Sequence, residues 1–464
     1  MKIAIIGGGP GGYVAAIRAA QLGAEVTLIE KRYMGGTCLN VGCIPTKALI
    51  HAADLYEEIK TQASKNGIIT EGVSVDFEAM QKKKASVVKH LVGGVGALMK
   101  ANGIEVISGT ACFISPKDIE IKTEEGVRTL TFDKAIVASG SLPSTVPIAG
   151  SDIEGVVDST GALSLEAIPE SMCIIGGGVI GIEMAHIYQN LGTKITIVEM
   201  LDDILVNMDM DVTAAIKKVM KKHKTVIMTG TKVNSIEQAD DGLVVNITDK
   251  DGNSGRIGAQ KVLMCVGRRP DTANLGLEAA GIKAEKGRIF VDERYRTSTD
   301  DIYAVGDCIG GIMLAHVASA EGIAAVENIM GLECSTDFDT VPSCVYTSPE
   351  LAGVGLTEQE AQRCGIEYET GVFPMMASGK AYIEGETSGL VKIIAEKETG
   401  KVLGLHMCGP SATELVTEGA LAIKMGAKVQ DIIDTIHAHP TVGESIHEAA
   451  HAVFGQSLNM PPSK

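Results

Sequence analysis

The stretch IAIIGGGPGG at residues 3–12 decides the fold of this chain. Its apolar half is typical of a buried strand, and its glycines Gly7, Gly9 and Gly12 have the spacing G-x-G-x-x-G before an Ala-rich, helix-like segment. A second apolar strand comes next and ends at Glu30. Such glycines let the backbone approach a pyrophosphate, the helix N-terminus offers free N–H groups, and the acidic residue accepts ribose hydroxyls. The stretch therefore predicts a dinucleotide-binding fold.

The same pattern occurs a second time, 169 residues later. Gly176, Gly178 and Gly181 repeat the glycine spacing, and the next strand ends at Glu199. Eleven of 28 positions are identical when the two units are aligned. Two glycine-rich turns without ligands are a poorer interpretation, because both copies carry the strand, the helix and the acidic residue together. We therefore expect two Rossmann-like dinucleotide-binding domains in one α/β chain.

Length and composition restrict the remaining possibilities. At about 150 residues per domain, 464 residues suggest about three domains, and the hydrophobic and charged fractions are typical of a globular protein. A net charge of −17 disfavours nucleic acid and anionic membranes as partners. No segment has the roughly 18 apolar residues of a membrane helix, and glycines interrupt the apolar run that a secretory signal would need. We expect a cytoplasmic protein that binds neither nucleic acid nor membrane.

Two of the ten cysteines, Cys38 and Cys43, lie close together, just beyond the first acidic residue. On a regular helix their separation would include about 7.5 Å of rise, beyond the ~7 Å Cα limit of a disulfide. The helix must therefore be distorted if they are to react together, and Gly42 and Pro45 permit this. Two structural thiols or half of a zinc site are alternatives, but zinc would require further ligands. The position favours redox chemistry.

With these motifs, the chain resembles the flavin-dependent pyridine nucleotide-disulfide oxidoreductases over its whole length. The resemblance implies FAD on the first fingerprint, NAD on the second, and a redox disulfide between Cys38 and Cys43. It also implies a C-terminal α+β dimerisation domain, and a catalytic pair, His439 and Glu444, in the segment HAHPTVGE. The domain boundaries expected on this basis are 1–146 for FAD, 147–266 for NAD, 267–336 for a central segment that completes the FAD domain, and 337–464 for the dimerisation domain.

The resemblance further assigns individual residues to the cofactors. The implied FAD contacts are Gly7, Gly9, Gly12, Glu30, Thr37, Lys47, Ala111, Ser139, Gly140, Asp307 and Ala315. The implied NAD contacts are Gly176, Gly178, Gly181, Glu199, Val233 and Gly267. Lys47 is also expected to act in catalysis with Glu183 as its partner. Two positions depart from the family pattern: Ser139 replaces the usual threonine but keeps its hydroxyl, and Leu142 stands at an often basic position.

Three features distinguish substrates within the family. Glu199 would repel the 2′-phosphate of NADP, the last six residues contain no extra redox cysteine, and the Cys-x4-Cys pair excludes the single-cysteine branch. The resemblance thus implies a homodimer that oxidises protein-bound dihydrolipoyl groups with NAD⁺, each catalytic histidine reaching the cysteines of the other subunit. The lipoylated partner would belong to a 2-oxoacid dehydrogenase, acetoin or glycine cleavage system. A reductase of another small thiol or disulfide, and a flavoprotein that only binds partners, are the alternatives.

One motif points to different chemistry. Residues 447–451 read HEAAH, a literal HExxH, which on a helix places two histidines on one face for zinc with a glutamate as base. Residues 452–464 contain no His, Asp or Glu that could be the third ligand. A zinc metallopeptidase is therefore a remote alternative, and no metal is expected.

Overall fold

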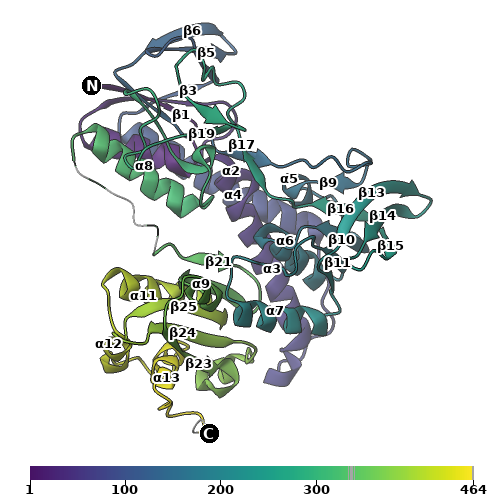
Figure 1. Cartoon of the computed structure of the whole chain (residues 1–464). Coiled ribbons are helices and arrows are strands. Elements are labelled where there is room, and N and C mark those ends of the chain that lie inside the picture. Colours follow the sequence, from purple (N-terminus) through teal and green to yellow (C-terminus); the bar gives the residue numbers. More distant parts are fainter. Residues whose placement is uncertain (333, 335–337, 339, 462–464) are drawn as a thin grey trace.

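The first dinucleotide fold is built on a parallel five-stranded sheet. The computed structural model describes residues 1–332, 334, 338 and 340–461 (Figure 1). The strands of this sheet, in spatial order, are β20 (Ile302–Ala304), β7 (Lys134–Val137), β1 (Lys2–Ile6), β2 (Glu25–Glu30) and β3 (Glu105–Ser108). Its helices are α1 (Pro10–Gln21), α4 (Phe77–Ala101) and α8 (Ala315–Ile329), and β4 (Thr110–Phe113), β5 (Asp118–Thr123) and β6 (Gly126–Thr131) form a small antiparallel sheet.

Glycine is required where α1 meets β1. Gly7 has φ +108°, and a Cβ on it would lie 2.2 Å from the carbonyl oxygen of Ala138. A Cβ on Gly12 would lie 1.9 Å from the carbonyl oxygen of Gly7. Any larger residue would separate the helix from the strand. The first and last glycines of the fingerprint therefore set the position of the α1 N-terminus above the end of the sheet.

The second dinucleotide fold repeats this construction. Its parallel sheet contains β12 (Val226–Met228), β11 (Lys194–Val198), β10 (Ser171–Ile175), β16 (Lys261–Met264) and β9 (Val156–Val157). Helices α5 (Ser159–Ala162), α6 (Val179–Asn190) and α7 (Met210–Lys222) accompany it, with an antiparallel sheet of β13 (Lys232–Ala239), β14 (Gly242–Thr248) and β15 (Ser254–Ala259). A Cβ on Gly181 would lie 2.2 Å from the carbonyl oxygen of Gly176, so the close helix–strand contact is the same as in the first copy.

The C-terminal part has a different architecture, with an antiparallel five-stranded sheet. The strands, in spatial order, are β21 (Ser343–Val345), β22 (Glu350–Gly355), β25 (Val402–Gly409), β24 (Leu390–Glu396) and β23 (Tyr368–Pro374). The helices are α9 (Glu358–Arg363), α10 (Gly379–Glu384), α11 (Ala412–Lys424), α12 (Val429–Asp434) and α13 (Glu444–Val453). Figure 1 shows this part, in light green and yellow, below the purple and green first fold, with the teal second fold to its right.

Segments far apart in the sequence meet in the first fold. After the second fold the chain returns, and β20 adds to the first sheet beside β7. The short strands β8 (Ser141–Pro143) and β17 (Arg268–Pro270) pair with each other at this crossing. These contacts agree with a central segment that belongs to the first fold, while the exact domain boundaries stay a prediction.

A buried lysine connects the second fold to the C-terminal sheet. Lys392 on β24 is 1% exposed, and its Nζ donates to Asp209 Oδ1 at 3.1 Å, to Asp211 Oδ2 at 2.6 Å and to Glu358. Asp209 caps the N-terminus of α7. Since an unpaired buried charge costs several kcal/mol, this cluster favours one fixed arrangement of the two parts.

Among the described helices, none combines the length and apolar character needed to cross a bilayer.

Candidate active site

A cavity of about 2210 Å³ lies between the parts of the chain, and residues of both fingerprints line it. The predicted site residues in its lining are Gly7, Gly9, Glu30, Thr37, Cys38, Cys43, Lys47, Ala111, Ser139, Gly140, Gly178, Glu183, Glu199, Gly267, Asp307 and Ala315. The fold thus brings the cysteine pair, both acidic residues and the predicted flavin contacts other than Gly12 to one continuous space.

Other predicted residues lie elsewhere. Gly12, Gly176 and Gly181 are at the helix–strand contacts described above and do not line this cavity. Val233 is 8% exposed and packs in a hydrophobic cluster of the second fold, so its side chain is part of the core. The remaining two, the predicted catalytic histidine and glutamate, lie on the C-terminal part and outside the lining.

The two acidic residues have matching surroundings. Glu30 Oε2 accepts a hydrogen bond from the Gly8 N–H at 2.6 Å, and Glu199 Oε2 accepts one from the Gly177 N–H at 2.6 Å. Each carboxylate thereby stands at the glycine turn of its own fold, beside an open helix N-terminus. The glycine turns, where a Cβ would fill the space, and the carboxylates beside them fit two dinucleotides.

The cysteine pair stands at a break between two helices. Helix α2 (Gly36–Val41) ends before Gly42, whose φ of −140° and ψ of −113° are not helical, and α3 (Cys43–Thr61) begins after it. This is the distortion that the cysteine spacing predicts. Both cysteines are free thiols in the structure, so the disulfide itself stays a prediction.

The two thiols differ in acidity. The hydrogen bond from Cys38 lowers the pKa of Cys43, and the positive charge of Lys47 lowers it further against the effect of burial. The same hydrogen bond, together with burial, raises the pKa of Cys38. Cys43 is therefore the sulfur that ionises first, and a thiolate is the form that reacts in disulfide chemistry.

Lys47 is paired with Glu183, as the sequence predicts. Its Nζ donates to Glu183 Oε1 at 2.9 Å and to Oε2 at 2.8 Å, and the Glu183 side chain is 4% exposed. Tyr346 completes the arrangement, because its backbone N–H donates to Glu183 Oε1 at 3.0 Å and its ring centroid lies 4.4 Å from the Lys47 Nζ. No local sequence signal could reveal Tyr346, which comes from the C-terminal part.

Asp307 is held by two residues that the sequence did not single out. The Ser141 hydroxyl donates to Asp307, and the Arg268 Nε donates to that hydroxyl at 2.7 Å. Arg268 also lies 3.8 Å from the Asp307 carboxylate. The carboxylate is thus fixed toward the predicted flavin position by the paired strands β8 and β17.

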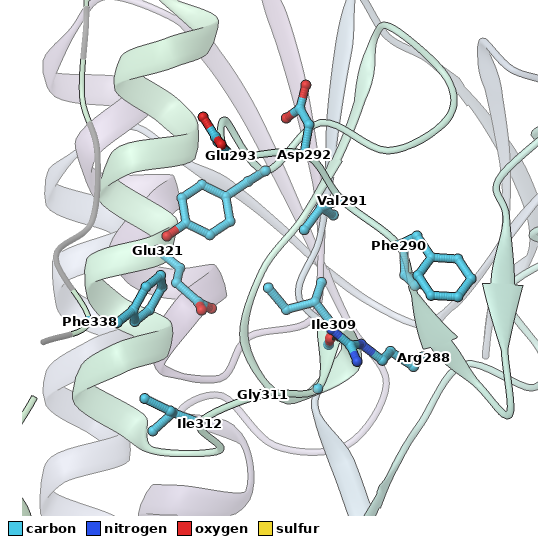
Figure 2. Close-up of a pocket in the computed structure, with 13 residues that line it drawn as sticks. Arg288, Phe290, Val291, Asp292, Glu293, Ile309, Gly311, Ile312, Glu321 and Phe338 are labelled. Carbon is cyan, nitrogen blue, oxygen red and sulfur yellow. Dashed lines mark hydrogen bonds between the residues drawn. The ribbon is translucent and has the colours of Figure 1, made fainter. Parts of the chain in front are cut away.

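A second, smaller cavity of about 280 Å³ lies beside the turn that comes after Asp307 (Figure 2). Glu321 on α8 and Ile309 border it, and Glu321 Oε2 accepts a hydrogen bond from the Gly306 N–H at 2.6 Å. Burial raises the pKa of Glu321 to about 7. This carboxyl supports the turn that carries Asp307.

His439 and Glu444 form the predicted pair on an exposed surface. His439 Nδ1 and Glu444 Oε1 are 2.9 Å apart, and the Thr441 N–H donates to Glu444 Oε2 at 2.9 Å. Burial opposes the charged carboxylate, but these two partners outweigh it and lower the pKa of Glu444. The His439 side chain is 79% exposed, which leaves Nε2 free to face a substrate.

The HExxH segment does not assemble a metal site. His447 Nε2 lies 3.0 Å from the carbonyl oxygen of Ile433, and its ring packs edge-on against His451 with centroids 4.7 Å apart. Glu448 is engaged by Ser457 and Asn459. Over the described part of the chain, no group of three or more His, Cys, Asp or Glu side chains is arranged to hold a metal ion.

Two dinucleotide folds around one cysteine pair, together with a hydrogen-bonded histidine–glutamate pair, are the features of a dithiol–disulfide oxidoreductase that works with dinucleotide cofactors. The chain belongs to the pyridine nucleotide-disulphide oxidoreductases: residues 1–322 match that family, and residues 341–450 match its dimerisation domain. This family uses FAD and NAD. The predicted fold class, including the dimerisation domain, is therefore confirmed.

Individual relatives resemble the chain over nearly its full length. Dihydrolipoyl dehydrogenase of Geobacillus stearothermophilus is 44% identical, over 98% of this chain and 97% of the relative. Leghemoglobin reductase of Vigna unguiculata is 42% identical, over 97% and 87%. Among solved structures, LpdA of Mycobacterium tuberculosis has a TM-score of 0.90 at 28% identity, covering 97% of this chain and 99% of its own.

The Lys47–Glu183 ion pair predicts that neutralising the lysine and neutralising the glutamate shift the pKa of Cys43 in opposite directions. Lys47→Met should raise the pKa of Cys43 and move its pH-dependent alkylation to higher pH by about one unit, because a cation no longer stabilises the thiolate. Glu183→Gln should move the curve to lower pH, because a repelling carboxylate is lost. The measurement is the alkylation rate of the reduced protein with Cys43 identified by mass spectrometry. Lys60→Met, on the same helix, is the control, and a Lys47→Met curve that overlays it would contradict this role.

Proposed function

We propose that this protein oxidises the dihydrolipoyl groups of a lipoylated protein and passes the electrons to NAD⁺, with FAD as its bound cofactor. The observation that carries the proposal is the position of Cys38 and Cys43 in the cavity that both fingerprints line. The substrate is supported by relatives named dihydrolipoyl dehydrogenase at 42–44% identity over almost the whole chain. FAD and NAD⁺, when bound, supply the route by which two electrons leave the cysteine pair.

The side chains of the protein account for the thiol chemistry. His439 accepts a proton from one dihydrolipoyl thiol, and Glu444 stabilises the imidazolium that results. The substrate thiolate attacks the Cys38 sulfur of the oxidised pair, the Cys38–Cys43 bond breaks, and Cys43 leaves as a thiolate beside Lys47. The second substrate sulfur attacks the first and displaces Cys38, and its proton passes to the departing Cys38 thiolate. The products are one cyclic lipoyl disulfide and one reduced cysteine pair, with Cys38 as a thiol and Cys43 as a thiolate.

An assay with several thiols tests the substrate. The purified, FAD-loaded protein should reduce NAD⁺ with dihydrolipoamide, and Cys38→Ser and Cys43→Ser should each lose almost all of this activity. Reduced glutathione should be a poor electron donor. Turnover with glutathione that exceeds turnover with dihydrolipoamide would favour the alternative reductase of another small thiol.

Cofactor choice should depend on Glu199. Its carboxylate stands at the second glycine turn and would repel a 2′-phosphate, so kcat/KM should favour NAD⁺ over NADP⁺ by about 100-fold or more. Glu199→Gln should reduce this preference, while Glu237→Gln, an exposed change on β13 of the same fold, should leave it unchanged. Equal kcat/KM for both cofactors in the unaltered protein would rule out this role.

The active site should be completed by a second subunit. The dimerisation domain supports a homodimer, and His439 is exposed and outside the cavity of its own chain. In such a dimer, His439 and Glu444 of one subunit face the cysteines of the other. The Cys43→Ser and His439→Gln proteins should each be nearly inactive. After subunit exchange about half of the dimers are mixed, and one of the two sites in each mixed dimer is intact, so roughly a quarter of full activity should return. Exchange without recovery would show that one chain forms the whole site.

We extend the proposal to the lipoylated partner and to the location of the protein in the cell. The lipoylated partner belongs to a 2-oxoacid dehydrogenase complex, an acetoin system or the glycine cleavage system, and the location is the cytoplasm. Isolation of the complex from cells, with identification of the lipoylated proteins bound to it, distinguishes among the three systems.

A further inference from the structure

Three imidazole rings lie together beside the His439 segment. The centroids of His437 and His447 are 5.2 Å apart, and those of His447 and His451 are 4.7 Å apart. We call these three rings the imidazole cluster. It includes both histidines of the HExxH motif, which the proposed function does not use. Its first member is in the segment between α12 and α13, two residues before His439.

Both ring nitrogens of His437 face hydrogen-bond acceptors. Nδ1 lies 2.9 Å from the carbonyl oxygen of Thr435, and Nε2 lies 3.0 Å from Glu418 Oε1 on α11. A carbonyl and a carboxylate only accept hydrogen bonds, so the imidazolium, in which both nitrogens donate, is the form of the ring that satisfies both contacts. The side chain is 11% exposed, which strengthens the charge-assisted bond to Glu418.

These contacts attach the segment that carries His439 to its surroundings. His437 joins the segment to α11, and His447 joins α13 to the last turn of α12 through the carbonyl oxygen of Ile433. His439 itself has only Glu444 as a side-chain partner among the contacts found in the described residues, and it is largely exposed. The orientation of the base therefore depends on the anchored segment.

The charge of His437 acts on the same pair. The positive charge contributes, after the bonds from Thr441 and His439, to lowering the pKa of Glu444. Two ionisable groups contact His437: Glu418 on α11 through a hydrogen bond, and His447 on α13 through ring packing. His437 thus combines a mechanical contact and an electrostatic effect at the catalytic pair.

We propose that His437, held as an imidazolium by Glu418 and Thr435, is a positioning residue that orients the His439–Glu444 pair for removal of the substrate thiol proton. The inference rests on the proposed function, since it concerns the same base. It gives the first histidine of the HAHPTVGE segment a role distinct from that of the second.

The rates of two half-reactions of the FAD-loaded dimer, reduction by dihydrolipoamide and reduction by NADH, distinguish misplacement of His439 from general loss of structure. His437→Gln should slow reduction of the enzyme by dihydrolipoamide about 10- to 100-fold and leave reduction by NADH unchanged, because only the first requires the base. Glu418→Gln should give an intermediate loss. His451→Gln, at the far end of the imidazole cluster, is the control and should match the unaltered protein in both half-reactions.

The outcomes distinguish this inference from the proposed function. Equal dihydrolipoamide rates in His437→Gln and unaltered protein, or equal slowing of both half-reactions, would overturn the inference and leave the function in place. Failure of the unaltered protein to react with dihydrolipoamide would instead contradict the function. Nitrogen NMR of labelled histidine, assigned with His437→Gln, tests the inference without substrate. Two protonated ring nitrogens at neutral pH are expected, and a neutral ring would overturn it.

Discussion

A single buried carboxylate, that of Glu183, joins all three parts of the chain. Lys47 comes from the helix that begins at Cys43, Glu183 from the helix after the second glycine turn, and the Tyr346 N–H from the C-terminal part. Removal of one partner from a buried pair leaves an uncompensated charge, which costs about 3–5 kcal/mol. This constraint keeps the second dinucleotide fold in position relative to Cys43. Thiol acidity and domain arrangement therefore depend on the same ion pair.

The two dinucleotide folds use the same backbone geometry at their two binding sites. In both copies the last glycine of the fingerprint lets the helix contact the strand at a distance that a Cβ would prevent, and in both the acidic side chain accepts a hydrogen bond from the glycine turn. The copies differ in the segment beyond the second strand. Only the first continues into the broken helix with Cys38 and Cys43, so the two sites share a binding mode but not a chemistry.

The histidine–glutamate pair and the cysteine pair are located on different elements. The cysteines lie in a cavity where neighbouring charges and burial set their acidity, whereas His439 lies on an exposed segment supported by side chains of α11 and α13. An exposed histidine can meet a substrate carried by a large protein, and a partly buried dithiol is less accessible to unwanted exchange. The match to a dimerisation domain supports the proposal that this exposed pair completes a site on a second subunit.

The sequence by itself determined both dinucleotide folds, the distortion between Cys38 and Cys43, and the Lys47–Glu183 pair. The first two depend on local backbone geometry, which glycine spacing and cysteine spacing record directly, and the ion pair was expected from family resemblance. Only the tertiary structure revealed Tyr346 at Glu183, the support of Asp307 by Ser141 and Arg268, the buried Lys392 cluster, and the two bonds of His437. It also placed Val233 in the core. These contacts join residues that are distant in sequence or lie in irregular segments, and no local pattern encodes which side chains packing brings together.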